Sequence, residues 1–459
     1  MDALNLFGLF AVTAMLVCYA LEDCDILFIL AFAAACALGL AYGFCRAPGR
    51  SGWSRRSGPL LRCGAGTSGG ARMHSSPASL VLISNLDRGN DALPQSPQEQ
   101  IMWPDRRLID LFKTEFPIVL APMAGVMDAD LVIAAAQGGA LGSLPCALLS
   151  VEKAREQVNI IRQRVSAPVN MNFFCHKPAD ADPKREAQWK QRLAPYYKEL
   201  GLDPAAPVNA ANRAPFDAAM CELVEELKPE IVSFHFGLPD TALLKRVKAA
   251  GCVVISSATI VKEAIWLEEN GVDAIIAQGA EAGGHRGMFL TDNIAEQPGT
   301  FALVPQVVDA VKVPVIAAGG IADGRGIAAA FALGAAGVQI GTAYLRCPES
   351  KLIAPARSAL GQARDDSTVL TNVMTGRPAR GVINRVMREV GPISGDAPAF
   401  PHAATGLAPL KAAAEKLGRV DFTNLWAGQA VRLGREMPAA ELTRALAGAA
   451  LARLSQMAR

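Results

Sequence analysis

The stretch "PVIAAGGIADGRGIAAAFALGAAGVQIGT", Pro314–Thr342, decides the fold because it holds two short apolar runs separated by a helical segment. The first run ends at Gly319 and Gly320, and the second ends at Gly341 and Thr342. Short continuous apolar runs are typical of parallel strands that are buried on both faces. A strand, a helix and a second strand in this order place both strands parallel in one sheet. The stretch therefore predicts a parallel sheet with a glycine-rich loop after each of two strands.

The same alternation of apolar runs and helical segments occurs in the preceding part of the chain. Six more runs fit it: "PIVLAP" (117–122), "ALGSL" (140–144), "PVNMNFF" (168–174), "IVSFHFG" (231–237), "CVVISSA" (252–258) and "DAIIAQG" (273–279). Eight such units indicate an α/β fold of the (β/α)8 TIM-barrel type. A doubly wound sheet is the alternative, but no GxGxxG sequence follows the first strand. The chain after the last strand is expected to form a C-terminal helical cap.

Two uncharged apolar segments, residues 3–21 and 26–44, lie near the beginning of the sequence. Each has about the length that a helix needs to cross a bilayer. An acidic turn at residues 22–25 separates them, and several arginines follow the second segment. By the positive-inside rule, the two segments are expected to form a transmembrane helical hairpin with both ends in the cytoplasm.

Three regions are therefore expected along the chain. Residues 1–46 form the hairpin, residues 47–100 form a flexible linker rich in Gly, Ser, Arg and Pro, and residues 101–459 form a catalytic domain. This organisation predicts a cytoplasmic catalytic domain tethered to the inner or plasma membrane. The alternative is that residues 1–100 come from an upstream reading frame or a fusion, since "MWPDRRLIDLF" at Met102 resembles a natural start.

The composition excludes several classes of function. The 459 residues carry 45 Lys and Arg against 43 Asp and Glu, a net charge of +2. No basic stripe with interleaved aromatic residues is present, so no nucleic-acid partner is expected. The ten cysteines contain no CxxC pair, which indicates a reduced compartment and cysteines used as small apolar residues. The five histidines show neither HxH nor HExxH spacing, so no metal site is predicted.

The chemistry of a TIM barrel lies where its strands end. The loops after the seventh and eighth strands are both glycine-rich, and a helix begins at the first of them with Asp323 as its expected N-cap. Such loops offer backbone N–H groups to a phosphate. No Walker A motif is present, and flavin mononucleotide (FMN) fits these loops. In this interpretation "APMAG" sets the backbone of Met123 against the flavin ring, and Asn172 and Gln278 hydrogen-bond to its polar edge.

The stretch "AQGAEAGGHRG", Ala277–Gly287, surrounds a single imidazole, His285, with four glycines. Glycine permits a ligand to approach the backbone closely. A neutral His285 would take a proton from a carbon beside a nitro group, whereas a protonated His285 would hold an anion. The structural alternative is a loop histidine bonded to backbone. His235, at the end of the strand in "SFHFG", belongs either to the pocket or to the core.

Seven motifs in the same order resemble the nitronate monooxygenases, formerly called 2-nitropropane dioxygenases, and most closely the class that favours propionate 3-nitronate. They are "APMAGV", "VNMNFFCHKP", "VSFHFGLP", "AQGAEAGGHRG", "VIAAGGIADGRG", "QIGTAYL" and "NLWAGQ". The resemblance covers residues 101–459. It implies an FMN-dependent detoxifying enzyme. Such an enzyme uses O2 for the oxidative denitrification of alkyl nitronates, and it yields a carbonyl compound with nitrite or nitrate.

The resemblance also implies roles for individual residues. His285 and His235 correspond to the active-site histidines of the family. The family's flavin contacts fall on Asn172, Gln278, Gly283, Gly320, Gln339, Ile340, Gly341 and Thr342, beside Gly319 and Met123 from the strand ends. In some members a Tyr and a Lys of the lid contact substrate. Phe400 stands near the position of that Tyr, Lys411 is the candidate cation, and Tyr196 or Tyr197 is a further candidate contact.

Two other functions remain open at this stage. A flavin-dependent enoyl reductase shares the barrel and would reduce its flavin with NADH or NADPH. A membrane-tethered flavoprotein scaffold would depend on the hairpin instead. Among single residues, Cys175 is interpreted as a buried small side chain, and Arg286 as a substrate or phosphate cation or a surface charge. Trp426 in "TNLWAGQ" is expected to serve for packing within the helical cap.

Overall fold

The computed structural model describes residues 102–180, 182–206, 208 and 213–458. The expected hairpin at residues 1–46 and the linker at residues 47–100 lie outside these ranges. Within the described ranges, no helix is both long enough and apolar enough to cross a membrane.

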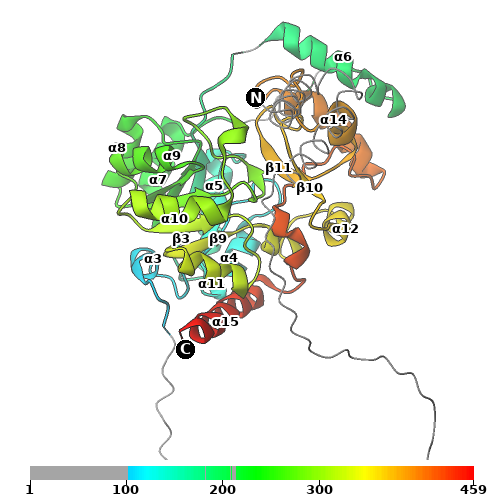
Figure 1. Cartoon of the computed structure of the whole chain (residues 1–459). Coiled ribbons are helices and arrows are strands. Elements are labelled where there is room, and N and C mark those ends of the chain that lie inside the picture. Colours follow the sequence, from blue (N-terminus) through cyan, green and yellow to red (C-terminus); the bar gives the residue numbers. More distant parts are fainter. Residues whose placement is uncertain (1–101, 181, 207, 209–212, 459) are drawn as a thin grey trace, which may run out of the picture. The chain divides into compact units, whose positions relative to one another are not determined.

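Eight parallel strands form the centre of the molecule (Figure 1). They are β1 (Ile118–Leu120), β2 (Gly142–Pro145), β3 (Val169–Phe174), β4 (Ile231–His235), β5 (Val253–Ala258), β6 (Ala274–Gln278), β8 (Val315–Ala318) and β9 (Gly337–Ile340). Their order is β1-β9-β8-β6-β5-β4-β3-β2, and a parallel bridge between Val119 and Leu141 brings β1 back to the β2 side. The predicted barrel of eight parallel strands is confirmed, because each predicted run contains one of these strands.

Helices cover the outside of the barrel. They are α3 (Arg107–Phe112), α4 (Ala129–Gln137), α5 (Val151–Arg164), α7 (Ala218–Leu227), α8 (Thr241–Ala249), α9 (Val261–Glu269), α10 (Thr300–Ala310) and α11 (Gly324–Ala332). Several begin at a residue whose side-chain oxygen accepts a backbone N–H of the first turn, as Ser150 does for α5 and Asp217 for α7. Buried apolar side chains of these helices share one core with the strands.

The last helix, α15 (Ala439–Met457), packs against α11 and α4 on the flank of the barrel (Figure 1). The approach is close, since a Cβ added to Gly324 would lie 2.6 Å from the carbonyl carbon of Ala449. This helix therefore completes the outer layer of the barrel and does not belong to a cap over its mouth.

The cap combines two segments that are far apart in the sequence. One is α6 (Pro183–Glu199), which follows β3, and the other contains β10 (Thr368–Thr371), β11 (Ala379–Val382), α13 (Arg385–Val390) and α14 (Ala403–Lys416). Figure 1 shows α6 beside α14, and the two helices are in contact. Their apolar core is separate from that of the barrel and includes Trp189, Leu193, Leu407 and Phe422.

The expected C-terminal helical cap is confirmed only in part, since α13 and α14 belong to the cap but two other components do not come from C-terminal helices. Part of the cap comes from the insertion after β3, and part of it is an antiparallel sheet in which β11 lies between β10 and β7 (Gly284–His285). The "TNLWAGQ" stretch is largely non-helical, and Trp426 pairs with Gly381 in an isolated bridge. Shorter elements complete the chain: η1 (Ile294–Glu296), η2 (Thr342–Arg346), α12 (Ala354–Gln362) and η3 (Gln429–Leu433).

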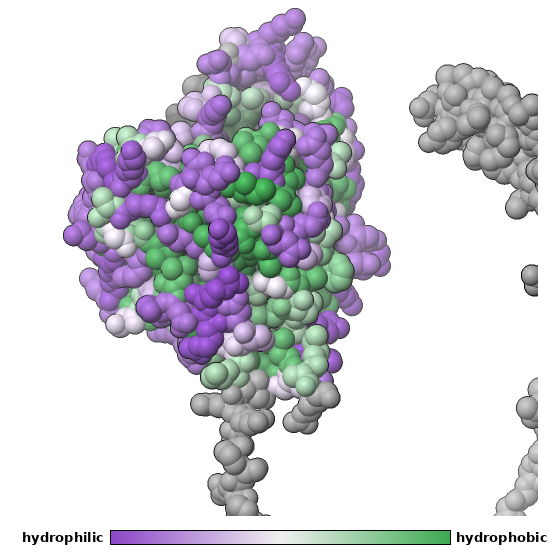
Figure 2. All heavy atoms as spheres, turned by 60° about the vertical axis from the view of Figure 1, so that its left-hand side comes forward, coloured by the Kyte–Doolittle hydropathy of each residue, from purple (hydrophilic) through white to green (hydrophobic). Residues whose placement is uncertain are grey.

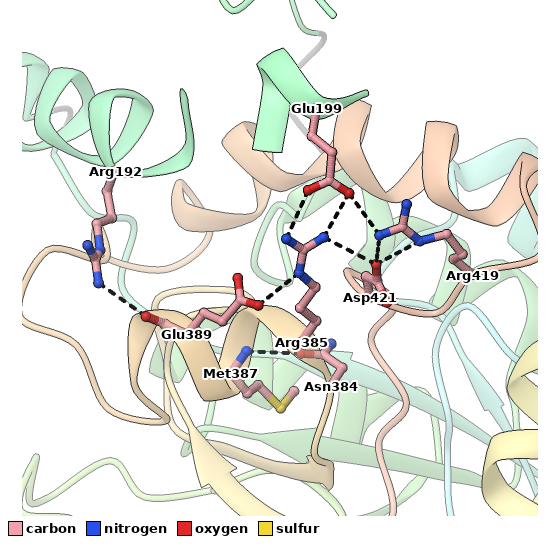
Figure 3. Close-up of polar contacts among 8 residues, drawn as sticks. All are labelled: Arg192, Glu199, Asn384, Arg385, Met387, Glu389, Arg419 and Asp421. Atoms are coloured by element: carbon pink, nitrogen blue, oxygen red, sulfur yellow. Dashed lines mark hydrogen bonds and ion pairs between the residues drawn. The ribbon is translucent and has the colours of Figure 1, made fainter. Parts of the chain in front are cut away.

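An ion-pair network joins the end of α6 to α13 (Figure 3). Arg385 lies 2.8 Å from Glu199 and 2.9 Å from Glu389, measured between nitrogen and oxygen. Arg419 lies 3.0 Å from Glu199 and also pairs with Asp421. The network therefore ties the insertion to the second segment of the cap at its solvent-facing side.

One face of the molecule carries groups of hydrophobic side chains between hydrophilic ones (Figure 2). Scattered exposed apolar side chains are ordinary for a protein surface. In the described chain the most exposed of the large ones is Phe301 on α10, at 75%.

Candidate active site

A cleft with about 1510 Å³ of empty space, its open mouth included, lies at the carboxyl ends of the strands. Its walls come from the ends of β1, β3, β4, β5, β6, β8 and β9, from the loop that holds His285, and from residues 424–430. Every residue predicted to be catalytic or to bind the flavin, except Ile340, lines this cleft: Met123, Asn172, His235, Gln278, Gly283, His285, Gly319, Gly320, Gln339, Gly341 and Thr342. Ile340 is 1% exposed and packs into the barrel core instead.

The ring of His285 is fixed at one nitrogen. Its Nε2 lies 3.0 Å from the hydroxyl oxygen of Thr375, and that hydroxyl donates to the carbonyl of Arg377 at 3.3 Å. Because the hydroxyl has one proton and gives it to Arg377, it accepts a hydrogen bond from Nε2–H. This network favours the neutral tautomer in which Nε2 carries the proton and Nδ1 keeps its lone pair.

The surroundings of His285 keep the imidazole neutral. Burial holds its pKa well below the usual range, and the positive charges of Arg213 and other neighbours act in the same direction. Of the two expected roles, the geometry favours the proton acceptor over the imidazolium that holds an anion.

Both ring nitrogens of His235 form hydrogen bonds within the protein. Its Nδ1 lies 2.6 Å from the hydroxyl of Ser257, and its Nε2 lies 3.2 Å from the carbonyl oxygen of His285. Burial lowers the pKa of His235 to about 3, so the ring is neutral. His235 therefore lines the cleft but serves to hold the backbone of His285.

Gln278 holds the same loop from the end of β6. Its amide nitrogen donates to the carbonyl of His285 at 3.0 Å, and its oxygen accepts the backbone N–H of Gly287 at 2.8 Å. Asn172 is fixed by a 2.9 Å hydrogen bond from its amide nitrogen to the Ser233 hydroxyl. The Gln278 oxygen is thus already hydrogen-bonded to the His285 loop, whereas the Asn172 side chain lies at the cleft wall.

Most glycines around His285 are required because neighbouring protein atoms occupy the space that a side chain would fill. A Cβ at Gly279 would lie 2.0 Å from the Thr300 hydroxyl, and one at Gly283 would lie 2.6 Å from the Gly428 nitrogen. A Cβ at Gly287 would lie 2.6 Å from the Ser257 hydroxyl. Gly284 alone combines a positive φ of +79° with open space. The expectation that these glycines make room for a ligand therefore applies to Gly284 only.

Arg286 is a structural residue of the same loop. It is fully buried, and its guanidinium donates to the carbonyls of Gly279 at 2.9 Å, Ala282 at 2.5 Å and Gly284 at 3.2 Å. Burial lowers its pKa to about 9. Both expected roles, a substrate or phosphate cation and a surface charge, are wrong, because carbonyl oxygens of the loop surround its guanidinium.

The loops after β8 and β9 have the features of an anion cradle. Gly319 and Gly320 adopt φ values of +118° and +70°, a region that favours glycine. The Asp323 carboxylate caps α11 by accepting the N–H groups of Arg325 and Gly326, as predicted. The side-chain oxygen of Gln339 is buried without a hydrogen-bond partner in the described chain. A flavin would supply donors to this oxygen through its ribityl hydroxyls or its ring N–H, so these residues fit such a cofactor.

Three of the side chains expected from the sequence as substrate contacts, Lys411, Tyr196 and Tyr197, lie away from the cleft. Lys411 faces Glu415 on α14 at 3.9 Å, and the Tyr197 hydroxyl donates to the carbonyl of Gly406 at 2.7 Å inside the cap. Tyr196 is buried in the same cap core. These three expectations are wrong, since the insertion after β3 uses its tyrosines to bind α14.

Three further side chains approach the cleft, and of these only Phe400 was expected there from the sequence. The ring of Trp426 lies 5.4 Å from that of His285 between centroids, and Phe400 lies at the same distance. Arg213, from the loop before α7, lines the cleft directly. Neither periodicity nor motif marks Arg213, because it follows an insertion without a regular pattern. Cys175 is half-buried, and desolvation raises the pKa of its thiol well above the usual value, which agrees with its interpretation as a small packing side chain.

Comparisons with known proteins agree with this arrangement. The family model described as nitronate monooxygenase matches residues 105–448. The nitronate monooxygenase of Paraburkholderia phytofirmans is 42% identical over 339 residues, which cover 73% of this chain and 93% of the relative.

Solved structures give the same result. The nitroalkane oxidase from Streptomyces ansochromogenes has a TM-score of 0.70 and 35% identity, and the match covers 77% of this chain and 100% of that one. FabK from Thermotoga maritima has a TM-score of 0.59 and 26% identity over 78% of this chain and 99% of that one. The chain therefore belongs to the nitronate monooxygenase family of flavin-dependent oxidoreductases.

Proposed function

We propose that the protein is an FMN-dependent monooxygenase for alkyl nitronates of the propionate 3-nitronate type. It uses O2 and releases a carbonyl compound with nitrite or nitrate. The observation that carries this proposal is the neutral His285, whose free Nδ1 lies on the wall of a cleft between two glycine-rich loops and an apolar cap. Detoxification of nitronates is the corresponding physiological role.

The cofactor site follows from the strand ends. The loops at Gly319–Gly320 and Gly341–Thr342 would hold the phosphate, and Gln339 would accept a hydrogen bond from the flavin. Asn172 and the backbone of Met123 would border the ring. Bound flavin supplies the electron transfer and the oxygen chemistry.

The protein's own residues bind and orient the substrate. Thr375 fixes the Nε2–H of His285, so Nδ1 is the atom available to accept a proton from the carbon of a parent nitroalkane, a proton that a nitronate has already lost. The low pKa of His285 makes it a weak base, because proton abstraction is favoured when the catalytic pKa lies near the working pH. The site therefore suits a substrate that arrives already deprotonated, as a nitronate, better than the parent nitroalkane. Trp426 and Phe174 give the cleft apolar walls that exclude water.

An aerobic assay tests this function. The FMN-loaded full chain should consume O2 and release nitrite with propionate 3-nitronate when no NADH is present. His285→Asn should lower kcat/KM for the parent 3-nitropropionate, whose carbon still carries the proton, by about 10²- to 10⁴-fold, the usual contribution of a positioned base, and should affect the nitronate much less. The flavin spectrum of the variant should match that of the wild type, which separates loss of chemistry from loss of cofactor.

A different result would favour the enoyl-reductase alternative. If the protein ignores nitronates but oxidises NADH or NADPH rapidly with reduction of its flavin, the proposed function is wrong. Unchanged turnover of both the nitroalkane and the nitronate in His285→Asn would leave the activity but remove His285 from it.

A further inference from the structure

The charges at the cleft are unbalanced. Among the described residues that line it, Arg213 is the only Lys, Arg, Asp or Glu, and His235 and His285 are neutral. A cleft with one cation and no carboxylate in its described lining attracts anions. The proposed reaction gives no role to Arg213, because it uses only His285 and the flavin-binding loops.

Among the described residues, no side chain or carbonyl forms a hydrogen bond or ion pair with the guanidinium of Arg213. Its Nε is buried and forms no hydrogen bond within the described chain, and its central carbon lies 5.6 Å from the centroid of the Phe400 ring. Burial lowers the pKa of Arg213, which shows that water solvates the charge poorly. A half-buried cation whose Nε is shielded from water and has no hydrogen-bonding anion is poorly solvated, so this group is prepared to bind one.

Arg213 lies at the substrate end of the cleft. The backbone N–H of Phe216 donates to the carbonyl of Phe174 at 2.8 Å, which attaches the Arg213 segment to the end of β3. In the strand order, β3 is four positions from β8 in either direction around the barrel, so it stands opposite the Gly319–Gly320 loop. The arginine is thus on the far side of the cleft from the expected phosphate.

Two contacts place Arg213 near His285 instead. Phe400 packs against the His285 ring at 5.4 Å between centroids, and the Arg213 guanidinium carbon lies 5.6 Å from the centroid of the same Phe400 ring. After burial, the charge of Arg213 is the strongest influence that lowers the pKa of His285. A substrate whose reacting carbon faces His285 can therefore extend a substituent toward Arg213.

We infer that Arg213 binds a carboxylate on the substrate, so that the enzyme selects nitronates which carry a second anionic group. The inference rests on the proposed function and names the residue that sets its substrate class. The planar guanidinium matches a carboxylate with two parallel hydrogen bonds, a geometry that a lysine ammonium does not reproduce. Lys411, the cation expected from the sequence, pairs with Glu415 on α14, so Arg213 is the cation available to the substrate.

Paired substrates test the assignment. Propionate 3-nitronate and propyl-1-nitronate have the same chain length, with a carboxylate in the first where the second has a methyl group. Arg213→Met should lower kcat/KM for propionate 3-nitronate by about 10- to 100-fold, chiefly through KM, and by less than about threefold for propyl-1-nitronate. Arg213→Lys should keep part of the preference, and Lys190→Met, which removes an exposed charge from α6, should change neither value.

A binding measurement separates this inference from the proposed function. Succinate carries a carboxylate in place of the nitronate group, and butyrate lacks the second anion. Calorimetry with the FMN-loaded full chain should show tighter binding of succinate than of butyrate, and Arg213→Met should abolish the difference. If this holds without any nitronate turnover, the anion site stands and the proposed function fails. If nitronates are turned over but Arg213→Met affects both nitronates equally, or neither, the inference is wrong.

Discussion

His285 shows how a single residue gains its properties from its neighbours. Thr375 fixes one ring nitrogen, burial keeps the ring neutral, and Gln278 and His235 both bond to its backbone carbonyl. Gly287 is part of the same arrangement, because its missing side chain leaves room for Ser257 and His235. The glycine and the histidine are therefore coupled through packing.

Alanine substitutions at three glycines should separate these effects. Gly287→Ala should lower the free energy of unfolding by about 1–3 kcal/mol, because the new Cβ would lie 2.6 Å from the Ser257 hydroxyl and 2.9 Å from His235 Cε1. Gly284→Ala should cost about 1 kcal/mol through its positive φ alone. Gly361→Ala, at an exposed site in α12 with open space, should stabilise the protein by about 0.5–1 kcal/mol. Denaturant titration measures all three, and equal effects at Gly284 and Gly287 would contradict the packing argument.

At the scale of elements, the cap is a small assembly of its own. The insertion helix α6 contributes Trp189, whose indole N–H donates to the carbonyl of Ala403 at 3.1 Å, and Tyr197, which bonds to Gly406. Gly406 lets α14 approach closely, since its Cβ would lie 3.1 Å from the Trp189 ring. Apolar packing therefore holds one side of α6, and the ion-pair network of Arg385 holds the other (Figure 3).

Loss of Arg385 should loosen α6 without affecting the barrel. In Arg385→Met, amide hydrogen exchange of α6 should accelerate by about two- to fivefold, the range that partly exposed ion pairs account for. High salt should produce much of the same change in the wild type, because it screens these charges. Arg388→Met, also on α13 but outside the network, is the matched control. Equal exchange in both variants would show that the network does not hold the helix.

At the scale of the whole molecule, the barrel and the cap enclose three neutral histidines. Burial lowers the pKa of His176 to about 4 and that of His235 to about 3, and it holds the pKa of His285 well below its usual value. In the unfolded chain each would titrate near about pH 6.5. The folded state therefore binds fewer protons than the unfolded state just below this pH.

Stability should consequently decrease as the pH falls. For a group whose pKa is lowered on folding, the contribution to stability is full above the unfolded pKa and is lost toward the folded pKa. Between about pH 6 and 5, up to three extra protons on the unfolded chain should lower the free energy of unfolding by up to about 4 kcal/mol per pH unit. Denaturant titrations across this range measure the slope, and His176→Gln should reduce it by about one proton. A flat profile would show that these histidines are protonated in the folded protein.

The sequence by itself determined the barrel and most of the cleft. Strands buried on both faces must be continuous apolar runs, so the positions of the strands between Pro117 and Thr342 could be predicted from the sequence. Parallel strands necessarily bring their carboxyl ends to one side of the barrel. The glycine-rich turn at Gly319 and Gly320 and the N-cap at Asp323 could also be predicted, because both depend only on the local conformation of the backbone.

Only the tertiary structure decided what depends on contacts between distant segments. The cap could not be read from the sequence, because its core joins α6 to α14 across the intervening strands of the barrel. The structural role of Arg286 depends on carbonyls that surround it only after the loop has folded. The exposure of Arg213 to the cleft, and the neutrality of His285, likewise arise from burial among neighbours that the chain order does not reveal.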